Sequence, residues 1–316
     1  MRRALLVGIN DYSWAPLKGC INDVVKMEAA LAEHHDGQPN FEITKITSDQ
    51  QPVTEALLYK GVSELFSNAA DVALFFFSGH GVERPLGGYL VTQDGEKHDI
   101  GMSINEVIQL ANLADHIKEV VIIIDACHSG HAGNINPLNK NIASLRKGVT
   151  ILASCLPDEY AMEKNGQGVF TSLVTEAING GAADVLGHVT IAGVYNHADK
   201  ALGAMDQRPV FKTYVTQLFS LKNHKPQIAW RALENLTTYF PQNDSQYKLC
   251  PTYEPTADPK DEEKEAIFDF LQKCVRKNLV EPVGEEHMYY AAMNRKSCQL
   301  TQTGRLYWKM VKQGKI

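Results

Sequence analysis

Short runs of consecutive apolar residues alternate along this chain with longer segments whose apolar residues recur at helical spacing. Residues 72–77 and 120–124 are apolar throughout and rich in aromatic or β-branched side chains, which is typical of strands buried on both faces. The other segments with a strand pattern are 4–9, 41–46, 149–153 and a short one near 209–212. The alternation predicts an α/β fold with a mostly parallel, six-stranded sheet that is covered by helices on both faces.

The predicted helices lie between these strands. Their ranges are 24–32, 53–66, 103–114, 169–178 and 189–202. Ser103 followed by Glu106 favours a capping box at the start of the third helix. Asn22 or Asp23 is the predicted N-cap of the first helix.

The pattern changes near Lys222, so we predict one domain over residues 1–221 and a second over 222–316. We expect residues 228–240 to form one helix, and the four prolines within 241–259 favour a linker. An amphipathic helix at 262–278 precedes a predicted hairpin, with 287–293 and 297–301 as its strands, and a final helix at 303–312. This small α+β domain resembles a winged-helix module.

Composition narrows the class of protein. The chain has 316 residues, of which 44% are hydrophobic and 22% charged, as in ordinary globular proteins. A net charge of −6 argues against a general nucleic-acid binder. The six cysteines form no CxxC pair, no apolar run approaches the ~20 residues that span a bilayer, and the N-terminal apolar run ends at Asn10 without a cleavage-site pattern. We therefore expect a cytoplasmic protein that does not contact membranes.

Two strand ends carry the candidate chemistry. Cys127 follows the apolar run 120–124, and His80 follows the run 72–77. If the two strands are parallel neighbours, both residues emerge at the same edge of the sheet, where an imidazole can take the proton of a thiol. The amides of Gly81 and Cys127 are candidates for an oxyanion hole. A zinc site of Cys127, His128 and His131 is a weaker alternative because no second ligand pair accompanies them, so no metal is assigned.

The segments SGHG at 78–81 and DACHSG at 125–130 resemble the caspase–metacaspase superfamily of cysteine peptidases over about residues 3–215. The histidine lies 47 positions before the cysteine, in agreement with the spacing of about 50 that is known for caspases themselves. The resemblance implies a caspase-like sandwich and a cysteine endopeptidase with a His80–Cys127 dyad. One alternative is that Cys127 is a buried structural cysteine and His80 a core histidine. A second alternative for the function is a catalytically silent caspase-like scaffold whose C-terminal module binds a partner or nucleic acid.

A carboxylate near the nucleophile needs an explanation. Asp125 lies two positions before Cys127, so strand alternation places both on one face, where the acid opposes thiolate formation. Type I metacaspases resemble this chain at Cys20, Asp23, Ser78 and Asp125, which line their primary specificity pocket. The resemblance implies that the two aspartates bind the Arg or Lys before the scissile bond of a protein substrate. The alternative is that Asp23 caps a helix and Asp125 binds backbone amides.

Calcium activation is not favoured, and no cofactor is expected. Many metacaspases have a dense acidic cluster after the histidine, whereas this chain offers Asp94, Glu96 and Asp99, too few for a site of six or more oxygen ligands.

Regulation is predicted instead from the C-terminal domain. Bacterial caspase-like proteins of similar layout are often defence effectors switched on by a small molecule or a partner protein, so we expect a latent enzyme. Four basic residues near the C-terminus suit an anionic ligand such as a nucleotide, although a solvated helix face is the alternative. They are Arg305, Lys309, Lys312 and Lys315. A DNA-binding regulator is disfavoured by the net charge.

Overall fold

The computed structural model describes residues 1–85, 87–95, 100–126, 134–136, 139–154, 163–164, 166–202 and 208–316, with no side chains described for 134–143. Its centre is a six-stranded sheet in the order β14-β10-β7-β3-β1-β2, with β14 antiparallel to the others. The strands are β1 Arg2–Gly8, β2 Glu42–Thr47, β3 Val72–Ser78, β7 Glu119–Asp125, β10 Val149–Ala153 and β14 Val210–Tyr214. The predicted α/β fold with a mostly parallel sheet is confirmed.

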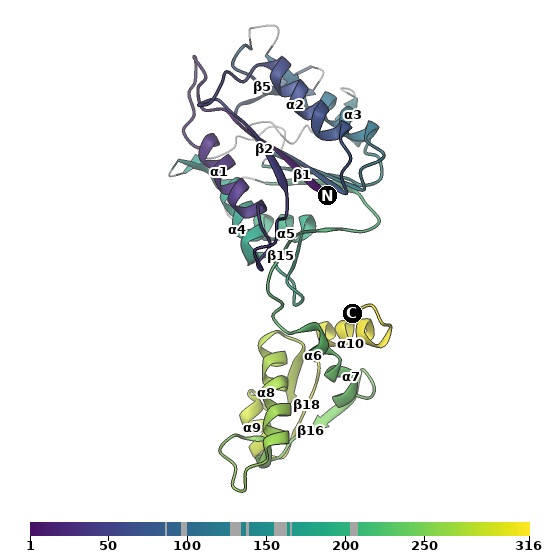
Figure 1. Ribbon diagram of the computed structural model, residues 1–316. Coiled ribbons are helices and arrows are strands. Elements are labelled where there is room, and N and C mark those ends of the chain that lie inside the picture. Colours follow the sequence, from purple (N-terminus) through teal and green to yellow (C-terminus); the bar gives the residue numbers. More distant parts are fainter. Residues whose placement is uncertain are drawn as a thin grey trace. The chain divides into compact units, whose positions relative to one another are not determined.

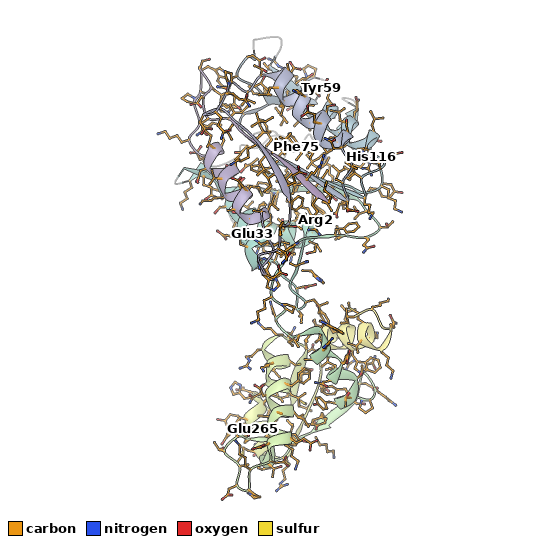
Figure 2. The ribbon with its side chains drawn as sticks, viewed as in Figure 1. Arg2, Glu33, Tyr59, Phe75, His116 and Glu265 are labelled. Carbon is orange, nitrogen blue, oxygen red and sulfur yellow. The ribbon has the colours of Figure 1, made fainter. Side chains whose placement is uncertain are left out.

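Helices cover both faces of this sheet (Figure 1). Helices α2 Glu55–Ser67 and α3 Ile104–Leu113 pack on one face, and α1 Cys20–Leu31, α4 Val169–Glu176 and α5 Ile191–Leu202 pack on the other. Neighbouring residues of β3 divide between the two cores: Phe75 and Phe77 join the first and Phe76 the second, all fully buried. Figure 2 shows Phe75 in the densely packed middle of this region. Burial on both faces explains why the strand sequences are continuously apolar.

Smaller elements surround the sheet. A three-stranded sheet consists of β4 Gly81–Arg84, β5 Gly87–Val91 and β6 Gly101–Ser103. The two-stranded pairs are β8 Asn134–Asn136 with β9 Asn139–Ala143, β11 Glu163–Lys164 with β12 Gln167–Gly168, and β13 His188–Thr190 with β15 Ser220–Asn223. A π-helical turn, η2 Ala177–Gly181, follows α4.

One predicted helix start is confirmed and another is wrong. Helix α3 begins with the expected capping box of Ser103 and Glu106. Helix α1 begins at Cys20, after Gly19, so neither Asn22 nor Asp23 is its N-cap. The side chain of Asn10, from the loop after β1, instead accepts the amide of Cys20 at 2.9 Å. Asp23 therefore lies within the first turn, and its carboxylate can serve another purpose.

The chain divides into two compact units. The first unit contains residues 1–183 and 188–224, and the second contains 184–187 and 225–316. The second unit has its own apolar core and a three-stranded antiparallel sheet in the order β16-β18-β17. Its elements are α6 Trp230–Leu233, α7 Asn235–Tyr239, β16 Gln246–Lys248, η3 Pro251–Tyr253, α8 Glu262–Arg276, β17 Val280–Val283, α9 Met288–Met293, β18 Ser297–Leu300 and α10 Gln302–Lys312.

Three expectations for this unit are wrong. Residues 228–240 form two short helices and not one. The proline-rich stretch 241–259 is not a linker, because Leu249 and Tyr253 are buried in the core of the unit. The segment 287–293 forms a helix and not a hairpin strand, so the partner of β18 is β17. The apolar residues between the prolines supply enough buried surface to order that stretch.

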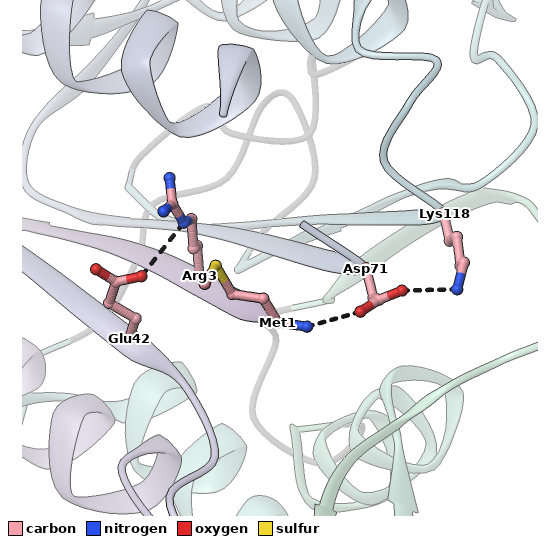
Figure 3. A network of polar contacts seen from close by, with 5 residues as sticks. All are labelled: Met1, Arg3, Glu42, Asp71 and Lys118. Carbon is pink, nitrogen blue, oxygen red and sulfur yellow. Dashed lines mark hydrogen bonds and ion pairs between the residues drawn. The ribbon is translucent and has the colours of Figure 1, made fainter. Parts of the chain in front are cut away.

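The amino ends of the strands carry an ion-pair network, drawn in Figure 3. The carboxylate of Asp71 accepts the terminal amine of Met1 at 2.7 Å and the ammonium of Lys118 at 2.6 Å. Nearby, Arg3 Nε lies 3.3 Å from a carboxylate oxygen of Glu42. These pairs tie together the starts of β1, β2, β3 and β7 at the edge of the sheet that is remote from the candidate site.

None of the helices in the described parts of the chain is long and apolar enough to cross a membrane.

Candidate active site

The pairing of β3 with β7 aligns the two segments that carry the candidate dyad. Their register runs from Val72 opposite Glu119 to Ser78 opposite Asp125, and one further bond joins the Gly79 amide to the Asp125 carbonyl at 3.2 Å. His80 and Cys127 each follow this last aligned pair by two positions in the sequence. Cys127 lies outside the described residues, as do His128 and His131, so the dyad, the oxyanion hole of Gly81 and Cys127, and the zinc alternative stay predictions.

The loop after β1 contacts His80 through three residues. The backbone amide of His80 donates to the Tyr12 hydroxyl at 3.1 Å, and that hydroxyl donates to the carbonyl of Val91 at 3.0 Å. The ring nitrogen Nε2 lies 2.7 Å from the carbonyl oxygen of Ala15. Because a carbonyl only accepts, Nε2 carries a proton, so the basic nitrogen of the unprotonated ring would be Nδ1. The ring also stacks on Trp14, with centroids 4.8 Å apart and planes inclined by 24°.

Gly79 makes this arrangement sterically possible. A Cβ atom at that position would lie 2.6 Å from the Tyr12 hydroxyl oxygen and 2.9 Å from the Phe77 ring. Any larger residue would therefore push Tyr12 away from the backbone of His80. The absence of a side chain at Gly79 therefore allows the loop that carries Tyr12 to pack closely against His80.

The four predicted pocket residues come together beside the end of the ladder. Ser78 Oγ donates to Asp23 Oδ2 at 2.8 Å, and Cys20 lies in the same turn of α1 as Asp23. Asp125, whose backbone is aligned with that of Ser78, accepts the hydroxyl of Thr171 at 2.6 Å and its amide at 3.2 Å. Both carboxylates are almost fully buried, with 1% of Asp23 and 5% of Asp125 exposed.

Gly168 lies close to both carboxylates. Its amide donates to the carboxylate of Asp23 at 3.0 Å. A Cβ atom at position 168 would overlap Asp125 Oδ2 and lie 3.0 Å from Asp23 Oδ2. The two carboxylates therefore converge on one small residue at the start of α4, and they form a single acidic cluster.

Burial and mutual repulsion control the ionisation of this cluster. Burial raises the pKa of Asp23 to about 7, and the negative charge of Asp125 raises it further, against the hydrogen bonds from Ser78 and Gly168. Burial also raises the pKa of Asp125, opposed by its bonds from Thr171. Among the described residues, neither carboxylate has a Lys or Arg partner. A cation that entered this site would replace a proton as the compensating charge.

Cys20 is part of the cluster and not a second nucleophile. Burial raises the pKa of its thiol to about 12, with the negative charges of Asp23 and Asp125 acting in the same direction. The thiol therefore stays protonated at neutral pH beside the two carboxylates.

Several residues of the site were missed from the sequence. Gly168 and Thr171, which bind the two acids, lie at the start of a helix that was predicted only for its apolar spacing. Tyr12 and Trp14 lie in a loop, where periodicity carries no information. A signal existed in both cases: two large aromatic residues in a polar loop, and a glycine just before a helix.

The candidate calcium ligands are only partly described. Asp94 accepts the hydroxyl of Thr92 at 2.7 Å and the amide of Glu55 at 3.0 Å, so it binds the start of α2. Glu96 and Asp99 lie outside the described residues. No group of three or more potential metal ligands occurs within the part of the chain that the structure describes.

Comparison with known proteins gives a match to a family model and to curated relatives. The family model described as Caspase domain matches residues 1–228. Metacaspase-1B of Aspergillus oryzae is 30% identical over 204 residues, which cover 56% of this chain and 46% of that protein. Metacaspase-7 of Arabidopsis thaliana is 29% identical over 147 residues, covering 41% of this chain and 35% of that protein. The chain thus spans less than half the length of these relatives.

Solved structures show the same fold. Caspase-1 from Spodoptera frugiperda matches with a TM-score of 0.53 and 16% identity, covering 71% of this chain and 90% of that one. A protein from Geobacter sulfurreducens matches with a TM-score of 0.52 and 17% identity, covering 71% and 97% of the two chains. At this identity the likeness concerns the arrangement of strands and helices alone.

Proposed function

Because this chain belongs to the caspase-domain family, we propose that it is a cysteine endopeptidase that cleaves proteins after Arg, and less well after Lys. His80 and Cys127 form the catalytic dyad in this proposal. Cys20, Asp23, Ser78 and Asp125 form the pocket for the basic side chain.

One observation carries the proposed specificity: two buried carboxylates converge beside the end of the β3–β7 ladder with no basic partner among the described residues. Burying two unpaired acids is costly, and it also disfavours a thiolate nearby. A positive charge supplied by the substrate removes both penalties. A planar guanidinium can bridge two carboxylates with several hydrogen bonds, whereas an ammonium is a point charge, so Arg is preferred over Lys.

The proposed reaction follows from the proton position on His80. With Nε2–H bound to the Ala15 carbonyl, Nδ1 accepts the thiol proton of Cys127, and the thiolate sulfur attacks the carbonyl carbon of the Arg residue itself. The amides of Gly81 and Cys127 stabilise the oxyanion. The C–N bond then breaks as His80 passes its proton to the leaving amine, and water hydrolyses the acyl-enzyme to restore the thiol.

The test is a panel of peptides that end in Arg, Lys or Asp before a fluorogenic group, assayed with the full chain. We expect Arg to exceed Lys and Asp peptides to stay uncut. Cys127→Ala and His80→Ala should each lower kcat by at least about a thousandfold while circular dichroism stays unchanged. Cys250→Ala is a matched control, since hydrogen bonds from Thr252 lower the pKa of this second-unit thiol.

A preference for Asp peptides would refute the pocket assignment, and residual activity of Cys127→Ala above a thousandth of wild type would refute the nucleophile.

We further propose that the enzyme is latent and that the second unit controls it, as an effector of bacterial stress or antiphage defence. The independent core of that unit and its basic residues near the C-terminus support a separate binding function. An anionic small molecule such as a nucleotide, or a partner protein, would activate by binding the active state more tightly than the latent one. Nucleic acid and membranes are not part of this proposal.

Contacts of β15 and of residues 184–187 determine where a shortened chain for the latency test should end. A chain that ends at 221 would cut into β15, whose Lys222 ammonium donates to the carbonyl of Ala30 at 2.8 Å in the first unit. The shortened chain should instead end at His224. Val185 and Leu186 pack in the core of the second unit, so both should be changed to Ser in that chain. If the enzyme is latent, the shortened chain should cleave Arg peptides faster than the full chain does. Nucleotides should stimulate the full chain and leave the shortened chain unchanged.

Equal activity of both chains, with no response to nucleotides, would contradict the gating proposal and leave the peptidase proposal standing.

A further inference from the structure

Trp14 combines two properties that a purely structural residue rarely has. Its indole ring stacks on the imidazole of His80 at 4.8 Å, yet 64% of the residue remains exposed. Large aromatic side chains that only support a neighbour are generally buried, as Tyr12 is with 3% exposed. One face of the indole therefore contacts the candidate base, and much of the rest is open to solvent.

The proposed role of His80 as the base indicates which part of a substrate would approach the exposed surface of Trp14. In the proposed reaction, the proton on His80 must reach the nitrogen of the leaving amine, so that nitrogen has to lie within hydrogen-bond reach of Nδ1. The leaving amine belongs to the residue that follows the scissile bond. That residue therefore lies next to the imidazole, across the scissile bond from the preceding Arg that Asp23 and Asp125 would bind. Within the part of the chain that the structure describes, Trp14 is the exposed aromatic ring that contacts the imidazole.

We infer that Trp14 is a specificity-determining residue: its exposed indole forms the wall of the subsite for the residue after the scissile bond and favours a flat or bulky apolar side chain there. This inference rests on the proposed peptidase function and extends it to the leaving side of the substrate. The flat indole offers stacking to aromatic side chains and apolar contact to aliphatic ones, whereas glycine gains neither.

The polar anchors of the loop show that Trp14 is not needed to hold His80. Tyr12 binds the backbone of His80, Ala15 accepts from its ring nitrogen, and Asn10 secures the loop at the start of α1. None of these bonds involves the Trp14 side chain. Removing the indole should therefore leave the loop path and the ring orientation in place and change mainly the contacts available to a substrate.

The test measures how the full chain hydrolyses internally quenched peptides. These peptides are identical except for Phe, Leu or Gly directly after Arg. Coumarin substrates are unsuitable because their leaving group is itself aromatic. For wild type we expect kcat/KM for Arg-Phe to exceed that for Arg-Gly by about tenfold. Trp14→Ala should bring this ratio close to one, and Trp14→Phe should largely retain it. Trp230→Ala, which removes an exposed tryptophan from the second unit, is the matched control.

A second readout separates a subsite from a support for His80. An Arg chloromethyl ketone alkylates Cys127 by forming an S–C bond and releasing chloride, so no residue occupies the leaving side. Trp14→Ala should lower hydrolysis of Arg-Phe about tenfold but lower the alkylation rate by less than about twofold. Equal losses on Arg-Phe, Arg-Gly and the ketone would show that Trp14 only supports the histidine and would overturn the inference. A wild type that cuts no Arg peptide would refute the proposed function, and this inference with it.

Discussion

Aspartates at the two edges of the same sheet are in opposite electrostatic situations. At the amino edge, Asp71 lies between the terminal amine of Met1 and the ammonium of Lys118, which lower the pKa of its carboxyl to about 2 (Figure 3). At the carboxyl edge, Asp23 and Asp125 are buried with hydroxyl and amide donors, and burial raises both pKa values. The first acid is half exposed and neutralised by the protein itself. The other two are buried and have no basic partner among the described residues.

This difference indicates what each aspartate is for. Asp71 joins strands β1, β3 and β7 at their beginnings, and its charge is balanced in the free protein. The pair at the other edge holds excess negative charge in a place where water cannot solvate it well, which costs stability. Proteins tolerate such a cost mainly at functional sites. The contrast supports a role of Asp23 and Asp125 in binding a cation from outside.

The largest expected effect comes from removing one charge of the buried pair. Asp125→Asn should lower kcat/KM on Arg peptides by about a hundredfold or more, because a buried charge-assisted hydrogen bond to the guanidinium contributes on the order of 3 kcal/mol. Steady-state kinetics on the Arg panel measures this. The loss should be smaller for a peptide with a neutral citrulline in place of Arg, which serves as the control substrate. A uniform loss on both substrates would mean that Asp125 has a structural role only.

The pH dependence of substrate binding should also differ between the charged and the protonated pair. Below pH 7 Asp23 holds a proton in the empty pocket, and above pH 7 it is ionised and attracts a cation. The KM for Arg peptides should therefore fall by about tenfold between pH 6 and pH 8, as one charge is added to the site. Asp23→Asn should flatten this profile. A KM that rises over the same interval would contradict the ionisation assigned to the pair.

A rise in pH, which should improve substrate binding, should lower the stability of the protein through the same carboxyl group of Asp23. The folded-state pKa of Asp23 lies above its unfolded value, so folding favours the protonated form and stability falls as the pH rises from about 4 to about 7. Asp23→Asn removes this loss. The variant should be more stable than wild type at pH 8 by about 2 kcal/mol, less than the ~4 kcal/mol that the shift represents, because one amide oxygen replaces two acceptors. Urea unfolding at pH 4 and pH 8 would show whether the gain appears only at the higher pH.

Sequence reasoning predicted the sheet well because its strands are buried on both faces. Runs such as 120–124 are apolar without interruption, and such a run leaves few alternatives to a central strand. The order of the first unit's helices followed from the same periodicity. The predicted start of α1 was wrong because the first amide of the helix donates to Asn10, ten residues earlier, and no local capping pattern reveals an acceptor that comes from a loop.

From the strand pattern alone, the candidate site was predictable only where strand ends determine it, and Cys20 and Asp23 on α1 were predicted through the resemblance to type I metacaspases. His80, Ser78 and Asp125 follow directly from the ladder of β3 and β7. Gly168 and Thr171 come from a segment more than 40 residues beyond Asp125, and Trp14 from a loop more than 60 residues before His80, so only the tertiary fold brings them to the site. In the second unit, the prolines of 241–259 outweighed Leu249 and Tyr253 in the prediction, although packing of these two residues decides the structure.

The smallest expected effect, and the matched control for Asp23→Asn, comes from Asp71→Asn at the amino edge. Here the folded-state pKa lies below the unfolded value, so the ion pairs stabilise the protein above about pH 4, and this contribution disappears as the pH falls towards 2. The two pairs are half exposed and screened by salt, so the loss at pH 8 should be small and should shrink further in 1 M NaCl. The same urea titrations measure it. Opposite signs for the two variants at pH 8 would support the contrast between the edges, whereas a gain in stability from both would show that excess negative charge in general, and not the buried pair, limits the stability of this protein.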